Sequence, residues 1–313
     1  GGGIRMQKKQ TTAEAEIEKE KLNVDMYALN SRVNDLYFGI LLLDEQLKQN
    51  ALLQDELERN YRQITAYVEN GIANQADLDA VKVEQLNTKQ KRVELVSSRM
   101  AYLKMLSLLV GEKLSQETVL EKPVPQDDIS AVGEIRRPEL SLFNAQGVGL
   151  QVQEKALNVR HLPQFGLFVQ GAYGNPGLNM LKNEFSPYYI AGVRLSWNFG
   201  SLYTLKNDRK VIENKRRQLD NNRDVFLFNT NLQSTQQSSA IQSMRRQMVD
   251  DDEIIRLRTN IRKSAEAKVA NGTLTVTEML RELTNESLAR QSKALHEIQR
   301  LMGIYQLKYT TND

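Results

Sequence analysis

The sequence predicts a mostly helical chain with a small β part, built around very long helices of coiled-coil character. Three observations predict this fold class. All six prolines lie between residues 123 and 187, so both flanks are free of helix breakers. Apolar residues recur every seven positions in the second flank. Two central segments instead alternate apolar and polar side chains, as β-strands do.

The two flanks are rich in Gln, Glu, Lys, Arg, Leu and Ala, which favour helices. We expect long helices over about 4–69 and over 201–270, each on the order of 100 Å long. The seven-residue spacing in the second helix resumes after a 15-residue step, through Leu205, Ile212, Leu219, Phe226, Ile241, Met248 and Ile255. This spacing is typical of a coiled coil that contains a stutter.

The flanks also form an internal repeat with an offset of 201 residues. Asn70-Gly71 interrupts the first flank and Asn271-Gly272 the second. At each point glycine is expected to end one helix, and an N-cap residue with an acid three positions later begins the next. The predicted turns, here named the first and second tip turns, cover residues 70–74 and 271–275. Each flank is therefore predicted to be a helical hairpin.

Shorter elements complete each repeat. The returning helices are predicted over 75–110 and 276–309, about half the length of the long helices. A further helix over 138–161, with proline in its first turn, would match the remaining half. The stretch 112–136 contains Pro123, Pro125 and Asp127-Asp128 and is predicted to be a connector near the middle of the hairpin.

The alternating segments are predicted to be strands over 164–174 and 189–199. In the second, one face carries Tyr189, Val193, Leu195, Trp197 and Phe199. Their length suits tilted transmembrane strands, and aromatic residues at strand ends suit the membrane interface. A soluble sheet half-buried on a core would alternate in the same way, so both readings stay open.

Composition excludes several classes of function. The 42 basic and 39 acidic residues leave a formal charge of only +3, which argues against a nucleic-acid partner. The absence of cysteine excludes thiolate metal sites and disulfides. No phosphate-binding glycine loop, catalytic constellation or metal-binding pattern is present, so we expect no enzyme activity, catalytic residue, cofactor or metal. His161 and His296, each without a ligand partner in the sequence, are expected to be structural.

These elements resemble the TolC-like outer membrane factor family from Gly3 to about Tyr309. Arg137-Pro138-Glu139-Leu140 looks like the family's opening of the second repeat. Leu162-Pro163 precedes the first strand, and the run Gly-Val-Arg-Leu-Ser-Trp-Asn-Phe-Gly from Gly192 to Gly200 covers the second. The two Asn-Gly turns also fall where the family has turns. The order and spacing of these motifs carry the resemblance.

The resemblance implies a homotrimer in which helices form an α-barrel tunnel and strands form a shared transmembrane β-barrel. It places the protein in the outer membrane of a Gram-negative bacterium, extending into the periplasm, as a passive exit duct for efflux or secretion. The implied partners are a periplasmic adaptor (membrane fusion) protein, an inner membrane transporter and outer membrane lipid. By this reading residues 1–136 are a first repeat lacking its β-hairpin, and 137–313 are the second repeat. The alternative is a soluble periplasmic protein of the adaptor type with a helical hairpin.

The resemblance also assigns site residues. The tip turns would contact the adaptor through Gly71, Ile72, Gly272 and Thr273, although asparagine stands where the family has valine. Helix termination explains the same glycines. Asp77, Glu278 and Arg281 would form a periplasmic gate, where the family's second acid is replaced by the arginine; alternatively, the two acids are simply capping residues.

The acidic run from Asp250 to Glu253 stands about 30 Å from the second tip turn along the helix. It could line the tunnel and make its interior acidic. A solvated outer face is the favoured reading.

Overall fold

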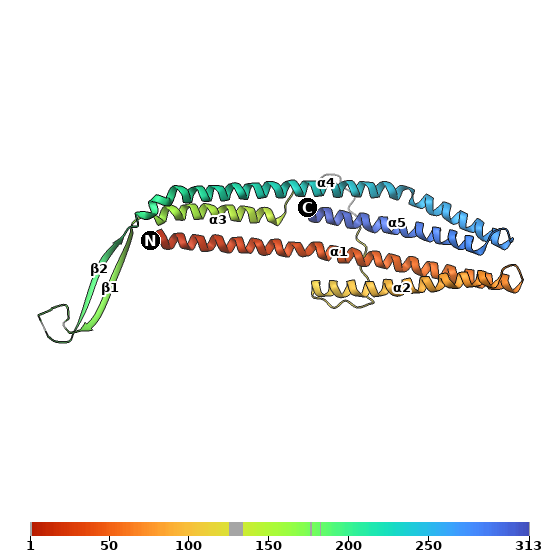
Figure 1. Ribbon diagram of the computed structural model, residues 1–313, viewed down its shortest axis with the longest axis horizontal. Helices are drawn as coiled ribbons and strands as arrows, with labels where there is room; N and C mark the ends of the chain where they lie inside the picture. Colours follow the sequence, from red (N-terminus) through yellow and green to blue (C-terminus); the bar gives the residue numbers. More distant parts are fainter. Residues whose placement is uncertain (1, 125–133, 176, 182, 313) are drawn as a thin grey trace. The chain divides into compact units, whose positions relative to one another are not determined.

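The computed structural model describes residues 2–124, 134–175, 177–181 and 183–312. In these ranges the chain forms α1 (Gly2–Glu69), α2 (Gln75–Val110), α3 (Pro138–Arg160), β1 (Gln164–Gly174), β2 (Ser186–Ser196), α4 (Gly200–Ala270) and α5 (Val276–Thr311), as Figure 1 shows. The predicted mostly helical fold with a small β part is confirmed. Across these ranges, no helix is both long enough and apolar enough to cross a lipid bilayer.

The chain divides into two compact units. Unit 1 contains residues 1–24 and 138–226, and unit 2 contains residues 25–137 and 227–313. The helices α1 and α4 each contribute a part to both units.

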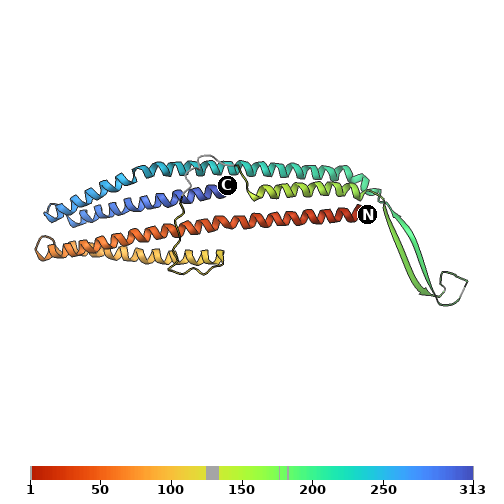
Figure 2. The same cartoon turned by 180° about the vertical axis from the view of Figure 1, so that it is seen from behind.

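In unit 2, α1 pairs with α2 and α4 pairs with α5, so each flank folds as the predicted helical hairpin (Figures 1 and 2). One hydrophobic cluster joins the two hairpins near their turns. It buries Leu57 and Val81 of the first hairpin with Val269, Met279 and Leu283 of the second. The two tip turns therefore lie side by side, because this cluster draws on the residues that flank both of them.

The segment that follows α2 is held on the hairpins by specific side chains. The buried guanidinium of Arg99 pairs with Asp44 on α1 and donates to the carbonyl oxygens of Gln116 at 2.7 Å and Thr118 at 2.8 Å. Lys122 pairs with Glu297 of α5 at 2.7 Å. These bonds fix the start of the predicted connector over 112–136, whereas Pro125 and Asp127-Asp128 lie outside the described residues.

The connector is also fixed at its other end. Arg137 lies over the rings of Tyr27 and Tyr309, at 5.0 and 4.9 Å from the ring centroids. The two rings stack with centroids 4.8 Å apart. The backbone N–H of Arg136 donates to the carbonyl of Thr311 at 2.8 Å. The first residue of the Arg-Pro-Glu-Leu motif thus ties the end of α5 to α1.

In unit 1, α3 packs along the first part of α4. Phe143 meets Phe226 with ring centroids 5.8 Å apart, and Arg216 pairs with Glu154 at 2.7 Å. Ile212, a member of the predicted seven-residue series, is buried. The series therefore does face neighbouring helices, as coiled-coil spacing requires.

The two strands of unit 1 form an antiparallel hairpin. Its register pairs Phe165 with Leu195, Leu167 with Val193, and Gly171 with Tyr189. Directly paired residues project to the same face of a sheet, so the apolar residues of both strands share one face. That face is open: Leu167 is 88% exposed and Val193 67%.

The second strand begins and ends three residues earlier than predicted, at Ser186 and Ser196 instead of 189 and 199. The cause is the start of its partner. Gln164 pairs with Ser196 and directly follows Pro163, which has no N–H to extend the ladder. Trp197 and Phe199 therefore lie beyond the strand, where the Trp197 indole N–H donates to the carbonyl of His161 at 3.1 Å.

Candidate functional site

The two tip turns have the same backbone hydrogen bonds, 201 residues apart. In the first, the N–H groups of Gly71 and Ile72 donate to the carbonyls of Val68 and Tyr67, at 3.1 and 2.8 Å. In the second, Gly272 and Thr273 donate in the same way to Val269 and Lys268, both at 2.9 Å. This is the Schellman motif, which requires a left-handed residue, and Gly71 and Gly272 have φ of 73° and 66°.

The asparagine before each glycine caps the end of its helix. The side-chain amide of Asn70 donates to the carbonyl of Ala66 at 2.7 Å, and that of Asn271 donates to Ala267 at 2.9 Å. Each amide thus adds a second hydrogen bond to a carbonyl that already accepts from the backbone N–H of the same asparagine, at 3.1 and 3.2 Å. Valine has no donor for this bond, so the departure from the family pattern has a local structural role.

Each returning helix begins with a capping box. Asn74 accepts from the N–H of Asp77, and the Asp77 carboxylate accepts from the N–H of Asn74, both at 3.0 Å. Thr275 and Glu278 repeat this exchange at 3.2 and 3.3 Å. Hydrogen bonds from Thr275 lower the pKa of Glu278. Both proposed gate acids therefore have a capping role, which does not exclude a second role because Glu278 is exposed and Asp77 is only half-buried.

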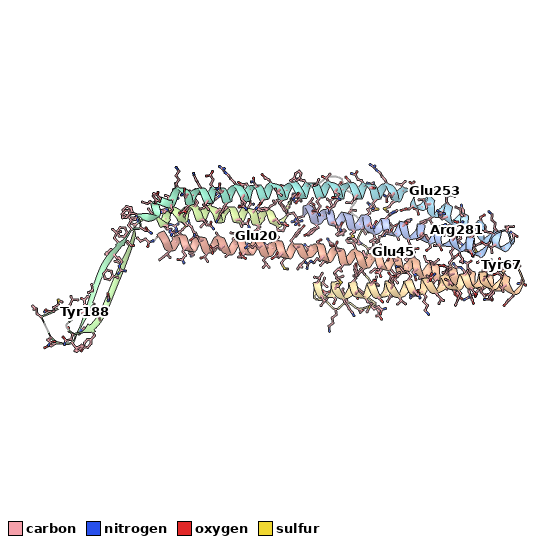
Figure 3. All side chains as sticks on the ribbon, in the orientation of Figure 1. Glu20, Glu45, Tyr67, Tyr188, Glu253 and Arg281 are labelled. Atoms are coloured by element: carbon pink, nitrogen blue, oxygen red, sulfur yellow. The ribbon has the colours of Figure 1, made fainter. Side chains whose placement is uncertain are left out.

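The other predicted tip residues are also accessible. Ile72 and Thr273 are exposed, and no atom within 4 Å would meet a Cβ at Gly71 or Gly272. Arg281, near the start of α5, is exposed (Figure 3). Its Nε lies 3.7 Å from Oε1 of Glu282. Exposed backbone, one apolar side chain and a few charges thus gather at one end of unit 2.

The comparisons with known proteins concern the fold. The CmeC outer membrane channel of Campylobacter jejuni aligns with 99% of this chain and 68% of its own length, at a TM-score of 0.79 and 12% identity. The outer membrane protein VceC of Vibrio cholerae aligns over 99% and 76%, with the same TM-score and identity. A membrane protein from Pseudomonas aeruginosa aligns over 99% and 73%, at 0.80 and 14%. This chain has the fold of an outer membrane channel. No family model and no curated protein matches its sequence.

Within this channel fold lies a charged network that the sequence analysis missed. Arg262 of α4 stands at its centre and is 13% exposed. Its guanidinium pairs with Glu56 of α1 at 2.9 Å, with Glu266 of its own helix and with Glu286 of α5. Burial alone would lower the pKa of Arg262, but the bond to Glu286 and the nearby carboxylates raise it. One side chain thus connects the two hairpins.

Glu286 is the most buried acid of the network, at 7% exposed. Arg290 and Thr259 donate to its Oε1 at 2.6 and 2.7 Å, and Arg262 donates to its Oε2. Burial alone would raise the pKa of Glu286, but these hydrogen bonds outweigh it and hold the pKa below its usual value. The carboxylate is therefore charged at neutral pH, as a buried acid can be only when it is fully paired.

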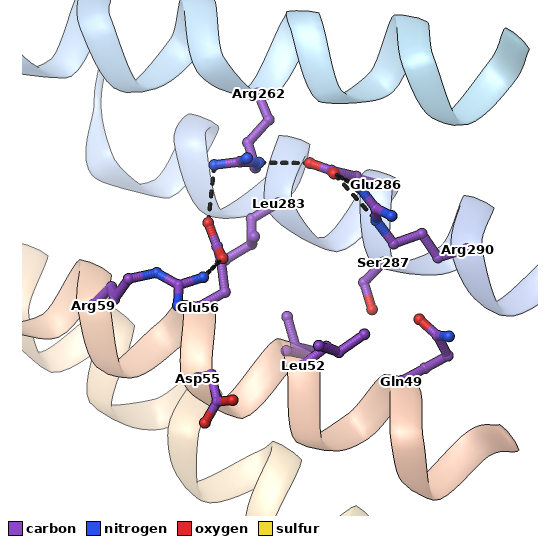
Figure 4. A pocket seen from close by; sticks show the side chains of 11 residues that line it. Gln49, Leu52, Asp55, Glu56, Arg59, Arg262, Leu283, Glu286, Ser287 and Arg290 are labelled. Atoms are coloured by element: carbon purple, nitrogen blue, oxygen red, sulfur yellow. Dashed lines mark hydrogen bonds and ion pairs between the residues drawn. The ribbon is translucent and has the colours of Figure 1, made fainter. Parts of the chain in front are cut away.

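The network lines one side of a groove of about 300 Å³ in unit 2. Figure 4 shows Arg262, Glu56 and Glu286 on this side, Leu52 and Leu283 beside them, and Asp55 directed away. The salt bridges leave the arginines with few free donors. The arrangement is suited to holding helices in register.

The predicted solvated face for Asp250 to Glu253 is wrong for one residue. Asp251 is only 5% exposed, and His296 of α5 contacts it at 2.9 Å. Asp252 and Glu253 do face solvent and pair with Lys293 and Arg256. Asp251 stands between Met248 and Ile255 of the seven-residue series, which places it on the face toward α5. His296, which the sequence left without a partner, thus pairs with Asp251, and this contact is consistent with the expected structural role.

We expect Glu286→Gln to weaken the fold by about 2 kcal/mol at neutral pH, because it removes the buried carboxylate that pairs with both Arg262 and Arg290. The pKa of Glu286 is lowered in the folded state. Its contribution is therefore fully present above the unfolded-state pKa and is lost as pH falls through the folded-state pKa. Denaturant unfolding in detergent, followed by circular dichroism from neutral pH to about pH 3, measures this.

The matched control is Glu18→Gln, which removes an exposed acid paired with Lys21 on the same long helix α1 that supplies Glu56. It should change stability by less than about 1 kcal/mol at every pH. Equal losses for the two variants, or a loss for Glu286→Gln that does not shrink in acid, would contradict the assigned role of the network.

Proposed function

We propose that this chain is a TolC-like outer membrane factor, a passive exit duct through the outer membrane and periplasm of a Gram-negative bacterium. The channel fold, which covers 98 to 99% of the chain in the six structures compared, supports the proposal. The β-hairpin supports a position in the membrane, because the apolar face of the hairpin is wholly exposed and each strand is 11 residues long. Lipid is the solvent that such a face requires.

The working form that we propose is a homotrimer. The two strands pair only with each other among the described residues, so each has one unpaired edge. An unpaired edge in hydrocarbon costs several kcal/mol per backbone group, so strands from other copies must complete a closed sheet. Long helices of the same copies would then surround a tunnel, consistent with the channel fold.

We further propose that the tip turns bind a periplasmic adaptor protein that links the duct to an inner membrane transporter. The exposed Gly71, Ile72, Gly272 and Thr273 would make the contact, and Asp77, Glu278 and Arg281 would narrow the tunnel beside it. Their common position at one end of unit 2 supports this assignment. The transported substance depends on the transporter, and both efflux and secretion fit a passive duct.

Leu167→Asp should abolish membrane insertion, because it places a charge in the centre of the exposed apolar face. Gln170→Asp changes a residue of the opposite face of the same strand and should insert nearly as well as the native protein. Flotation of the reconstituted protein with lipid vesicles measures insertion. If the native protein stays soluble without detergent and does not float, the soluble adaptor-type alternative replaces the proposed function.

Asp77→Asn combined with Glu278→Gln should raise single-channel conductance in a planar bilayer. Each amide oxygen can still accept the hydrogen bond of the capping box, so the change removes charge from the tip and leaves the helix starts intact. Glu253→Gln, which removes an exposed acid of α4 outside the tip turns, is the control and should conduct like the native protein. Unchanged conductance in the double variant would argue against a gate at these residues.

A photo-crosslinking amino acid at position 72 or 273 should capture an adaptor in the native host. The same group in place of Leu86, an exposed residue of α2 outside the tip turns, should capture none. Mass spectrometry identifies the captured protein, and the proposal requires a periplasmic protein with a helical hairpin. Capture of an adaptor only from position 86 would indicate that the adaptor binds α2 away from the tip turns.

A further inference from the structure

Three helix ends meet at the base of the β-hairpin in unit 1. A groove there is lined by Met6 of α1, Leu157 and Arg160 of α3, Gln164 of β1 and Ile212 of α4. Arg209 of α4 also donates to the side chain of Asn158 on α3 at 2.7 Å. The start of α1, the end of α3 and the start of α4 therefore surround the point at which the strands leave the helices (Figures 1 and 2).

Positive charge is concentrated at these helix ends. Residues 2–13, 155–166 and 190–212 contain nine lysines and arginines and a single acid, Asp208. We name the nine the basic collar: Arg5, Lys8, Lys9, Lys155, Arg160, Arg194, Lys206, Arg209 and Lys210. The rest of unit 1 reverses the balance, with ten acidic and seven basic residues. The small net charge of the whole chain thus conceals a strong local excess.

The collar side chains are exposed and mostly free of ion pairs. Arg5, Lys8 and Lys9 are spaced to share one face of α1, and none forms an ion pair with any described residue. Farther along the same helix, Lys19 and Lys21 do pair, with Glu16 and Glu18 at 2.9 and 2.6 Å. The difference follows from the sequence, because residues 2–13 contain no acid that could pair with these three side chains. These three members of the collar therefore carry charge that no ion pair compensates among the described residues.

A second observation places the collar beside a membrane interface. Trp197, Phe199 and Tyr203 follow β2 directly, and all three are exposed, Tyr203 to 92%. Aromatic residues, and tyrosine and tryptophan above all, gather where a protein leaves the hydrocarbon core of a bilayer. From β2 into α4, the order along the chain is thus an apolar hairpin, then exposed aromatic rings, then Lys206, Arg209 and Lys210, whereas Arg194 of the collar lies within β2. The same order is found across a lipid leaflet, from tails to charged headgroups.

We propose that the basic collar binds the phosphate groups of anionic phospholipids in the periplasmic leaflet. The inference rests on the proposed function, because it takes the β-hairpin to enter the outer membrane. Free phosphate would not explain the adjacent apolar face and aromatic rings, whereas a lipid headgroup explains all three together. A basic residue next to a membrane surface strengthens association with anionic lipid by about fivefold. The collar would fix how deeply the hairpin sits in the bilayer.

The test is flotation of the full chain with phosphatidylethanolamine vesicles that contain or lack phosphatidylglycerol, at low and at high salt. Phosphatidylglycerol should increase binding of the native protein, and salt should reverse the increase. The triple variant Arg5→Gln, Lys8→Gln, Lys9→Gln should lose about a hundredfold in binding to the mixed vesicles. Its binding to phosphatidylethanolamine alone should stay at the native level, which also shows that it is folded.

The matched control removes three exposed lysines of unit 2, with Lys89→Gln, Lys104→Gln and Lys113→Gln. It should bind both kinds of vesicle like the native protein. The proposal would be wrong if both triple variants lost vesicle binding equally. It would also be wrong if phosphatidylglycerol did not increase vesicle binding of the native protein. If the proposed function itself is wrong, the native protein should not bind even the vesicles of phosphatidylethanolamine alone. That result differs from either outcome that would contradict the basic collar.

Discussion

The seven-residue apolar seam along α4 is the constraint on which the other features depend. It directs Ile212 into unit 1 and Ala265 and Val269 into the cluster at the tips of unit 2. Helices in proteins draw most of their stability from the packing of their apolar face, so contact along this seam must hold the 71 residues of α4. Once the seam is fixed, the position of every other side chain of α4 around the helix follows, including those that carry charge.

The seam also explains why its polar members have partners. Asp251 and Arg262 stand at positions that face neighbouring helices, where a charge without a partner would cost several kcal/mol. His296 and Glu286 of α5 supply those partners. Such pairs add less stability than apolar contacts would, but they fit only one alignment of the helices. They therefore favour a single register between hairpins that apolar contacts alone would allow to slide.

The sequence predicted the helices well because proline, glycine and the capping residues mark their ends. Gln75 and Val276 begin helices as expected, since a capping box precedes each. The end of the second strand was misplaced because the alternation of apolar and polar residues continues to Phe199. Pairing with the first strand stops earlier, at Ser196. The partners of Arg262 lie on three helices, and no local pattern joins residues so far apart in the chain. Asp251 could have been found, because the seven-residue spacing already placed it on the inner face.

The shared geometry of the tip turns has a consequence for how a binding surface can change over time. Glycine and asparagine hold both turns through backbone and amide bonds, so the side chain of Ile72 contributes little to the fold, whereas the Thr273 hydroxyl adds one bond to the carbonyl of Lys268 at 3.1 Å. One turn presents the apolar side chain of Ile72 and the other the hydroxyl of Thr273. The shared backbone and amide bonds do not depend on these two side chains, so either residue can be substituted while its turn is kept. The repeat thus offers two surfaces of equal geometry whose chemistry can diverge independently.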